Sequence, residues 1–372
     1  MQTRYEPPAF TAEPLLDAPD ARFAEAPADG VLPEGYFSTT NLPTYVRVGG
    51  DWRLPERPRM DSAIVLLPDG TLEVREGRLV RAGQPVALGL AEDGSQGILV
   101  HPNGFREEGE ESEEFQFMTS EVSREKPVDY EAMAQALIRE RAHGGHVVWV
   151  LGPAVLHSRG RDAVSWFVHN GFVDALLGGN AIAVHDIEQA MMGTTLGMDH
   201  KGRPVRGGHA FHMRAINKVR GAGSLAAAVE QGILTDGIMH ACVTRDVPLV
   251  LCGSIRDDGP IPEVIQDVAA GQEAMREQAV RATMVVMIAT ALHSIAFGNM
   301  LPSYYRDEGG ELRGLTTIAV DSSEFLVSKL KDRGTLQAFG VITNAQDFLH
   351  VLRDHVQQAA PASVERTSVG VA

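Results

Sequence analysis

The side chains best suited to chemistry follow an apolar run near the middle of the C-terminal half. The run from Met284 to Ala289 leads into His293, Ser294 and Asn299, which can donate and accept hydrogen bonds. A buried strand that ends in small and polar residues is where an open α/β sheet holds its ligand. We therefore expect the segment 282–301 to form the floor of a ligand pocket rather than a membrane span.

Small or polar turns also follow the other apolar runs that we expect to be strands. Glycine lets backbone N–H groups approach phosphate oxygens, and a helix that begins after the turn adds a favourable dipole. Several such turns in one sheet predict a nucleotide-type ligand. The motif GxGxxG is absent, so a dinucleotide would bind in an atypical way. The turns are Gly152-Pro153-Ala154, Gly178-Gly179-Asn180, Gly253 to Gly259, Asp321-Ser322-Ser323 and Asn344.

Asp321 is the candidate for a ribose anchor. It stands at the end of the apolar run TTIAV, where a carboxylate can accept hydrogen bonds from ribose hydroxyls and repel a 2′-phosphate. This favours NAD over NADP. The alternative is that Asp321 caps a helix that begins near Glu324.

The segment HDIE, residues 185–188, has two interpretations. His185, Asp186 and Glu188 follow the run AIAV, which we expect to be a strand, so they could move protons near neutral pH. Alternatively, they mark the start of a helix whose first turn carries favourable acids.

The segment SIRDDGP also has two interpretations. Arg256 could hold a substrate carboxylate, and the neighbouring Asp257 and Asp258 could hold an ammonium group. The alternative is a plain charged turn.

Other kinds of site are disfavoured. His209 and His212 lack the i, i+4 spacing of a helical zinc pair and a suitable third ligand, so we predict no metal site. No G-x-S-x-G motif supports a serine nucleophile. Cys242 and Cys252 lie in apolar surroundings, which is typical of a chain in a reducing cytoplasm.

Composition gives broader limits. The chain has 372 residues, 44% hydrophobic and 22% charged, which is typical of a soluble globular protein. A formal net charge of −16 and the lack of a Lys/Arg-rich run argue against a nucleic-acid partner. The acidic balance fits a cationic or zwitterionic small substrate, but it fits general solubility equally well.

The elements that must position these residues fall into two parts. Residues 1–30 are Pro-rich and predict an extended or disordered arm. Residues 31–127 show short alternating runs separated by Gly-Gly, Asp-Gly and Asn-Gly, which predict a small β-rich domain; the acid run 107–115 is a candidate solvated connector. Residues 128–358 alternate between strands and helices and predict a parallel sheet. Residues 359–372 are expected to be a disordered tail.

Within the second part we expect specific helices and strands. AIAVHD should be a strand, followed by a helix from Ile187. The further helices are expected at 128–142, 162–169, 217–232, 233–245 and 262–280.

With these motifs placed, the chain resembles the alternative ornithine cyclodeaminase family, also called the LOR/SDH conserved-region family. That family includes archaeal stand-alone enzymes and the C-terminal part of cyanobacterial bifunctional arginine dihydrolase/ornithine cyclodeaminases. The resemblance extends from about Tyr36 to Val356. Its longest motifs, in order, are VLGPAVLHSRG, NGFVDALLGGNAIAVHDIE, RAINKVRGAGSLAAAVEQGILTDG, VPLVLCGSIRDDGPIPEVIQDV and ALHSIAFGNMLP.

The resemblance implies an α/β fold with a parallel Rossmann-like, deoxyhypusine-synthase-like domain that binds NAD tightly. The β-rich N-terminal domain would cover the substrate. The implied reaction is redox-neutral and belongs to arginine/ornithine metabolism and proline biosynthesis: L-ornithine, or a close diamino acid, gives L-proline, or its cyclic imino acid, and ammonia. A cytoplasmic homo-oligomer, dimer or tetramer, without membrane partner, is expected.

That chemistry requires a clamp for the substrate carboxylate, an anion for the distal ammonium and a group with a pKa near 7. Arg124 or Arg256 could be the clamp, and His185 or His293 could move the proton. Asp257, Asp258 or Glu188 could be the anion. The catalytic candidates are His185, Asp186, Glu188, Asp257 and His293, and the substrate-binding candidates are Asn41, Arg124, Arg256 and Asp258.

The cofactor candidates are backbone and side-chain positions at the strand ends and in the ALHSIAFGNMLP segment. They are Gly152, Pro153, Ala154, Asn180, Gly253, Asp257, Gly259, Ser294, Asn299, Met300, Leu301, Asp321 and Thr343.

Some features depart from the family pattern. Asn344 stands where the family usually has Asp, and the loop 303–314 is longer than expected. Two alternative functions therefore stay open. One is an NAD(H)-dependent opine- or saccharopine-type imine oxidoreductase, and the other is a non-catalytic NAD-binding sensor.

Overall fold

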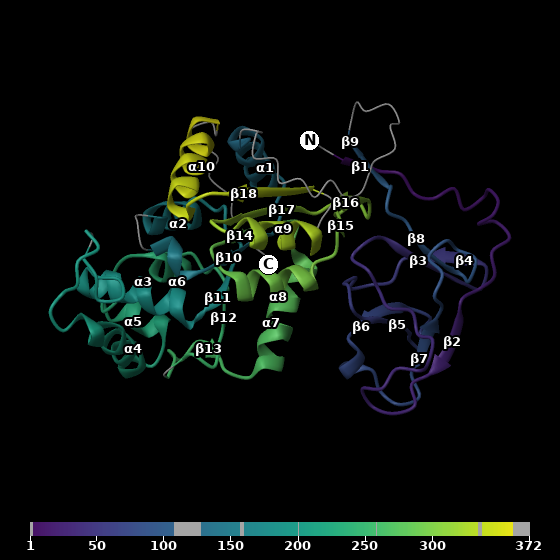
Figure 1. Cartoon of the computed structure of the whole chain (residues 1–372), viewed down its shortest axis with the longest axis horizontal. Coiled ribbons are helices and arrows are strands. Elements are labelled where there is room, and N and C mark those ends of the chain that lie inside the picture. Colours follow the sequence, from purple (N-terminus) through teal and green to yellow (C-terminus); the bar gives the residue numbers. More distant parts are fainter. Residues whose placement is uncertain are drawn as a thin grey trace, which may run out of the picture.

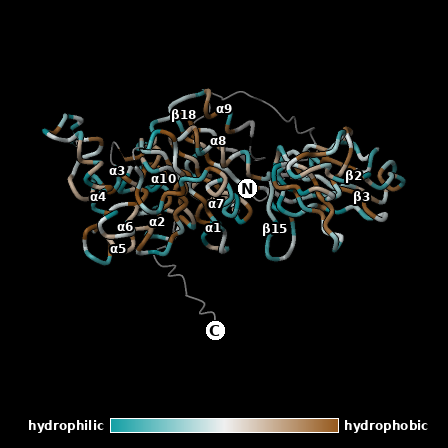
Figure 2. Tube along the Cα trace, turned by 90° about the horizontal axis from the view of Figure 1, so that it is seen from below, coloured by the Kyte–Doolittle hydropathy of each residue, from teal (hydrophilic) through white to brown (hydrophobic). Residues whose placement is uncertain are grey.

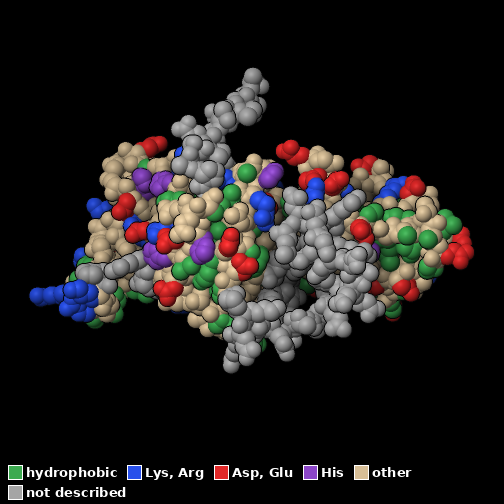
Figure 3. All heavy atoms as spheres, turned by 90° about the horizontal axis from the view of Figure 1, so that it is seen from above, with side chains coloured by type: hydrophobic (Ala, Val, Ile, Leu, Met, Phe, Trp, Pro, Cys, Tyr) green, Lys and Arg blue, Asp and Glu red, His purple; other side chains and the backbone are tan. Residues whose placement is uncertain are grey.

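The computed structural model describes residues 3–107, 128–156, 160–199, 201–257, 259–333 and 337–359. Its two halves lie side by side, a β-rich N-terminal half and a larger α/β half (Figure 1). Acidic, basic and His side chains are interspersed on the face that Figure 3 shows, with one group of basic side chains at the end farthest from the N-terminal half. No helix among the described residues is long and apolar enough to cross a membrane.

The N-terminal half contains two small antiparallel sheets of three or four strands. One has the strand order β2-β7-β5-β6 and the other the order β4-β3-β8. Gly49 and Gly50 connect β3 to β4 with φ angles of 63° and 88°, as the Gly-Gly hairpin signal predicted. The strands are β2 (Arg22–Glu25), β3 (Thr44–Val48), β4 (Asp51–Arg53), β5 (Ala63–Leu66), β6 (Leu72–Arg75), β7 (Pro85–Leu88) and β8 (Ile98–Val100).

The lead segment before residue 31 takes part in this pairing. Strand β1 (Thr3–Tyr5) pairs with β9 (Phe105–Glu107), and β2 pairs with β7. We expected this segment to be extended or disordered. Its two strands are extended and form backbone hydrogen bonds with β9 and β7.

The α/β half is built on one parallel sheet with the order β13-β12-β11-β10-β14-β17-β18. The chain fills one side outward from β10, returns to β14 beside β10, and then fills the other side. This is the doubly wound Rossmann order with one extra edge strand, β13. The strands are β10 (Val147–Leu151), β11 (Ala175–Gly179), β12 (Leu249–Cys252), β13 (Val264–Ile265), β14 (Met284–Ile288), β17 (Thr316–Asp321) and β18 (Gln337–Ile342).

Helices cover both faces of this sheet and form two cores. Trp149 of β10 belongs to the core under α1, α2, α3, α6 and α10, whereas Val148 and Val150 belong to the core under α7, α8 and α9. Apolar segments gather inside this half in Figure 2. The helices are α1 (Tyr130–Ala142), α2 (Gly160–His169), α3 (Asn180–Met192), α4 (Phe211–Ala222), α5 (Leu225–Glu230), α6 (Ile238–Thr244), α7 (Val268–Arg281), α8 (Ala291–Met300), α9 (Glu324–Arg333) and α10 (Ala345–Ala359).

Several predicted elements differ from those observed. The predicted strand AIAVHD is wrong, because Asn180 to Asp186 lie inside helix α3. The strand ends earlier, at Gly179, and the residues that follow, Ile182 to Glu188, are buried on all sides of a helix rather than on the two faces of a strand. The polar end of the 282–301 segment is also helical, in α8. The predicted helices at 217–232, 233–245 and 262–280 are shorter or divided.

The long loop 303–314 is an antiparallel hairpin between the two halves. Its strands are β15 (Tyr304–Arg306) and β16 (Leu312–Gly314). Tyr304 and Leu312 pack against Phe105 of the N-terminal half. The backbone N–H of Ser303 donates to the carbonyl of Asn41 at 2.8 Å. The hairpin is therefore the point at which the α/β half holds the N-terminal half.

A buried arginine provides a second connection between the halves. Arg276 of α7 is 4% exposed, and it donates to the carbonyl of Met300 and to the carbonyl of Arg57. Burial, together with the nearby charges of Arg59 and Arg57, lowers the pKa of Arg276 to about 10. Sequence reasoning did not identify this residue.

Candidate active site

All seven strands of the sheet are parallel, so their carboxyl ends lie along one edge. Ligands of such sheets bind outside this carboxyl edge, where the strand order reverses. In this chain the reversal lies between β10 and β14. The predicted turns after β10, β11, β12, β17 and β18 therefore belong to one edge, as the sequence indicated.

Backbone contact at the reversal point requires glycine. The N–H of Gly152, directly after β10, donates to the carbonyl of Ile288 at 2.9 Å. A Cβ atom at Gly152 would lie 1.8 Å from the carbonyl oxygen of Ala289. Ala289 itself has a φ of 56°, which non-glycine residues rarely adopt. Residues with strained backbone are often found at functional sites, where the surrounding structure fixes them. The turn after β14 contains such a residue.

The first turn after β10 is the short 3-10 helix Pro153–Leu156. The side-chain amide of Gln346 in α10 donates to the carbonyl of Ala154 at 3.1 Å. The strand end beside the reversal point is thus tied to the last helix of the domain.

His293 lies in the first turn of α8 and reaches across the edge towards β11 and β12. Its Nδ1 is 3.2 Å from Oγ1 of Thr290, and its ring forms a hydrogen bond to the backbone of Cys252. A Cβ atom at Gly179 would lie 2.9 Å from Cε1 of the ring. The glycine at the end of β11 therefore leaves the space that the imidazole occupies.

The environment of His293 favours its neutral form. Burial lowers the pKa of the imidazole below its ordinary value, and the hydrogen bond to Cys252 and the nearby carboxylate of Asp257 oppose this shift only in part. A neutral imidazole at the carboxyl edge can accept a proton from a substrate amine.

The loop after β12 is shaped by Asp257. Its Oδ2 accepts a hydrogen bond from the N–H of Ser254 at 2.8 Å, and the hydroxyl of Ser254 accepts from the N–H of Arg256 at 3.2 Å. Arg256 is exposed, so the structure places it at the surface of this loop. Gly253 donates its N–H to Ile265 of β13 at 2.8 Å. Sequence reasoning did not select Ser254, although it stands in the quoted SIRDDGP segment.

Two further contacts fix the far side of this loop. Oδ1 of the buried Asn180, the first residue of α3, accepts from the N–H of Ile261 at 3.2 Å. Arg220 of α4 donates to the carbonyl of Pro260 at 2.9 Å and lies beside Gly259, whose φ is 92°. These contacts hold the loop over the ends of β11 and β12.

Asp321 ends β17, next to β14. Its Oδ1 accepts from the N–H of Ser323 at 2.9 Å, so one oxygen begins the turn into α9 while Oδ2 lies outside that hydrogen bond. The N–H of Thr343, after β18, donates to the carbonyl of Asp321 at 3.1 Å. Asn344 accepts from the N–H of Gln346 at 2.9 Å and caps α10. The amide at this position thus performs the capping that an Asp would perform.

Asp186 lies in the middle of α3, away from the strand ends. Its side chain is fully buried and pairs with Arg161 of α2 at 2.6 Å. It also accepts from the N–H groups of Ile238 and Met239 at the start of α6, at 3.0 and 2.8 Å. Gly237 makes room for this pair, because its Cβ would lie 2.1 Å from the guanidinium of Arg161. This geometry favours a structural role.

Glu188 is also fully buried, near the end of α3. It accepts from the hydroxyl of Thr194 and the N–H of Gly197, both at 2.8 Å, and from the N–H of Leu196 at 3.1 Å. Nδ1 of His185 lies 3.3 Å from it. Glu188 therefore organises the loop after α3, and the ring of His185 lies against its carboxylate.

The remaining candidates are divided between other places. Ser294 is buried in the first turn of α8, beside His293. Asn299 lies six residues after His293 along the helix, about 9 Å at about 1.5 Å per residue. Asn299, Met300 and Leu301 thus lie at the end of α8 opposite the carboxyl edge, near Asn41. Arg124 and Asp258 lie outside the described residues.

Comparisons with known proteins agree with this architecture. Residues 131–352 match the model of "Arginine dihydrolase ArgZ-like, C-terminal, Rossmann fold", and residues 43–131 match that of the first region of the same C-terminal part. An "Ornithine cyclodeaminase" of Archaeoglobus fulgidus is 45% identical over 91% of this chain and 79% of its own length. That of Methanopyrus kandleri is 46% identical over 89% of this chain and 77% of its own.

The chain belongs to the ornithine cyclodeaminase family of archaeal and ArgZ-like proteins. Among solved structures of this family, a LOR/SDH protein from Methanococcus maripaludis S2 has a TM-score of 0.80 and 39% identity, over 92% of this chain and 98% of that chain. The structure of AgrE in ternary complex with ornithine and NAD+ has a TM-score of 0.58 and 38% identity, over 92% of this chain and 46% of that chain.

Proposed function

We propose that this protein is an NAD-dependent cyclodeaminase that converts L-ornithine to L-proline and ammonia. Relatives in the family at 45% and 46% identity are named ornithine cyclodeaminase. AgrE, which is 38% identical over 92% of this chain, has been solved with ornithine and NAD+. The observation that carries the proposal is the placement of His293, beside Gly179 and Asp257, on the carboxyl edge of a Rossmann-ordered sheet.

The residues at the reversal point fit a dinucleotide. Gly152 has no side chain between β10 and β14, and the N-termini of α3, α8 and α9 meet the same edge. Asp321 offers Oδ2 to a ribose hydroxyl, while its Oδ1 holds Ser323. A bound NAD, held by the turn at Gly152 and by Asp321, would supply reversible hydride transfer at the amine-bearing carbon of the substrate.

His293 is the residue that we assign to proton movement. The distal amine of the substrate must lose a proton before it attacks the imine carbon, and the departing amine must gain one as ammonia leaves. A neutral imidazole beside Asp257 can accept the first proton and return it for the second step. No net oxidant is consumed, because the hydride that leaves the substrate returns to the ring.

The other roles follow from position. We assign Asp257, beside His293, to the substrate ammonium. Arg256, exposed on the loop after β12, is the described candidate for the substrate carboxylate. The carbonyl of Asn41 accepts from the N–H of Ser303, a contact that positions the N-terminal half at the hairpin end of α8, and a substrate-binding role of Asn41 stays a prediction.

The test is turnover with a small amount of cofactor. Purified protein with L-ornithine and substoichiometric NAD should form proline and ammonia over many turnovers per NAD. Product that instead rises in proportion to added NADH would identify the imine oxidoreductase. Binding of NAD and ornithine without any product would identify the sensor.

A matched pair of variants tests the assignment of the base. His293→Gln keeps a hydrogen-bonding side chain but cannot exchange a proton, so kcat should fall by about 100-fold or more with NAD binding retained. The control is His209→Gln, which changes an exposed histidine. Equal kcat in the two variants would refute the role of His293.

The subcellular location and assembly stay predictions. Neither Cys242 nor Cys252 is in a disulfide, and these thiols are the basis for proposing a cytoplasmic enzyme. A homo-oligomer, dimer or tetramer, would be tested by light scattering of the purified protein.

A further inference from the structure

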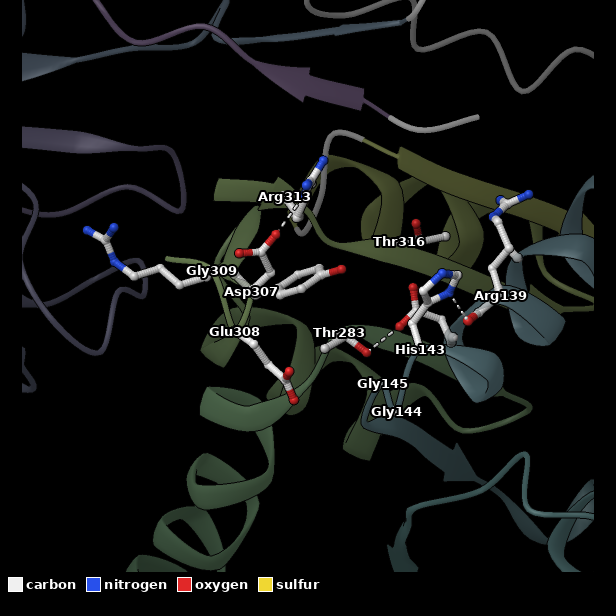
Figure 4. Close-up of a pocket in the computed structure, with 15 residues that line it drawn as sticks. Arg139, His143, Gly144, Gly145, Thr283, Asp307, Glu308, Gly309, Arg313 and Thr316 are labelled. Carbon is white, nitrogen blue, oxygen red and sulfur yellow. Dashed lines mark hydrogen bonds and ion pairs between the residues drawn. The ribbon is translucent and has the colours of Figure 1, made fainter. Parts of the chain in front are cut away.

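A polar cavity lies at the opposite, amino edge of the sheet. It has a volume of about 400 Å³ and lies between the last turns of α1, the starts of β14 and β17, and the β15–β16 hairpin. Figure 4 shows His143, Thr283 and Thr316 on the domain side, facing Asp307 and Arg313 on the hairpin. None of its lining residues belongs to the candidate active site. One wall is the β15–β16 hairpin, residues 304–314.

The floor of the cavity holds a carboxylate in a fixed position. Oγ1 of Thr283 accepts a hydrogen bond from the N–H of His146 at 2.9 Å and lies 2.5 Å from Oε2 of Glu140. Since the hydroxyl already accepts from the backbone, its proton points to Glu140. A Cβ atom at Gly145 would lie 2.2 Å from Oε2, so only glycine leaves room for this carboxylate.

Burial makes this carboxylate receptive to a cation. Burial raises the pKa of Glu140, although the hydrogen bond from Thr283 and the charge of Arg139 oppose the shift. A carboxylate that has lost hydration gains more from a bound ammonium than an exposed one does. Burial and the neighbouring Glu140 also raise the pKa of Tyr305 to about 12, so the phenol stays protonated and can donate.

The remaining lining charges have opposite signs. Asp307 already pairs with Arg313 at 2.9 Å. Glu308 on the hairpin is exposed, and Arg139 on α1 pairs with no carboxylate in the part of the chain that the structure describes. Arg306 also lines the cavity and donates to the carbonyl of Gly310. Apart from these contacts, the cavity offers one carboxylate in its floor, one at its rim, and the guanidinium of Arg139. This pattern matches two ammonium groups and one carboxylate.

We infer that the amino-edge cavity is a second binding site for a diamino acid, with Glu140 holding one ammonium group, Glu308 the other, and Arg139 the carboxylate. The site is separate from the carboxyl edge, and its existence does not depend on the proposed catalytic activity. Because Tyr304 and Leu312 of the hairpin pack on the N-terminal half, a ligand here would tie α1 to the hairpin that holds this half.

The probe is L-lysine, titrated calorimetrically into the full-length chain saturated with NAD. Cadaverine lacks the carboxylate, and L-norleucine lacks the side-chain ammonium. Each should bind roughly tenfold more weakly than lysine, because each loses one charge-assisted contact. Equal binding of all three compounds, or no saturable binding of lysine, would overturn the inference.

Variants separate this site from the active site. Glu140→Gln should weaken lysine binding roughly tenfold or more. The matched control Glu131→Gln, on the exposed first turn of the same helix, and His293→Gln should leave binding unchanged. If Glu140→Gln does not fold, Glu308→Gln at the exposed rim replaces it. Loss of binding in His293→Gln, or full binding in both cavity variants, would show that lysine occupies the carboxyl edge instead.

Discussion

The buried pair of Arg161 and Asp186 allows a sharp test of a structural role against a catalytic one. Both side chains are almost completely removed from solvent, and Asp186 also receives the N–H groups of Ile238 and Met239. Burial opposes the charge on Arg161, but the carboxylates of Asp186 and Asp236 outweigh it and raise the pKa of its guanidinium. Burial also raises the pKa of Asp186, which Arg161 and the two N–H groups oppose. The geometry of these hydrogen bonds therefore joins α2, α3 and the start of α6.

The perturbation is Asp186→Ala. It leaves a buried guanidinium with only Asp236 and leaves two buried N–H groups without their acceptor. Removing one partner of a buried pair costs about 3–5 kcal/mol. In a domain of this size, each kcal/mol of lost stability lowers Tm by about 2–4 °C, so the expected loss in Tm is roughly 6–20 °C. Asp186→Asn keeps an acceptor for α6 and should lose less.

The assay is thermal unfolding followed by circular dichroism, with NAD binding measured on the folded variant at low temperature. Asp354→Asn is the control, because it breaks an exposed pair with Arg353 and should cost about 0–1 kcal/mol. The double variant Arg161→Met/Asp186→Leu should recover part of the loss, since it leaves no unpaired charge. An Asp186→Ala variant with unchanged Tm and abolished turnover would refute the structural assignment.

Three further predictions concern other contacts. Gly179→Ala should displace the imidazole of His293 and lower kcat more than NAD affinity, which steady-state kinetics and titration separate; equal losses would contradict it. Asp321→Ala should weaken NAD retention by about 1–3 kcal/mol, and unchanged retention removes the ribose assignment. Burial lowers the pKa of His293 in the folded protein below the value of about 6.5 that it has in the unfolded chain. As the pH falls below about 6.5, the unfolded chain therefore takes up a proton more readily than the folded protein, and the free energy of unfolding decreases. His293→Gln should therefore flatten the stability profile between about pH 7 and pH 5; an unchanged slope in urea unfolding would contradict it.

Much of the fold and part of the site could be read from local sequence. Continuous apolar runs identified β10, β12, β14 and β17, because a strand buried on both faces has no polar alternation. The turns after them identified the carboxyl edge. The error at HDIE arose because a buried helix can present the same short apolar run as a strand, and only the packing of α3 on the sheet decides between them.

The sequence by itself determined the strand–turn–helix alternation, the glycines of the turns and the polar residues near His293, since these depend on neighbours along the chain. Only the tertiary structure decided which of these residues meet. It brings His293 to Gly179 across the strand ends, and it places Asp186 on Arg161 instead. It also makes the β15–β16 hairpin a wall of the cavity at the amino edge. The physical reason is that the pKa and the hydrogen bonds of a buried charged side chain depend on the groups that contact it in place of water. Those groups come from distant parts of the chain.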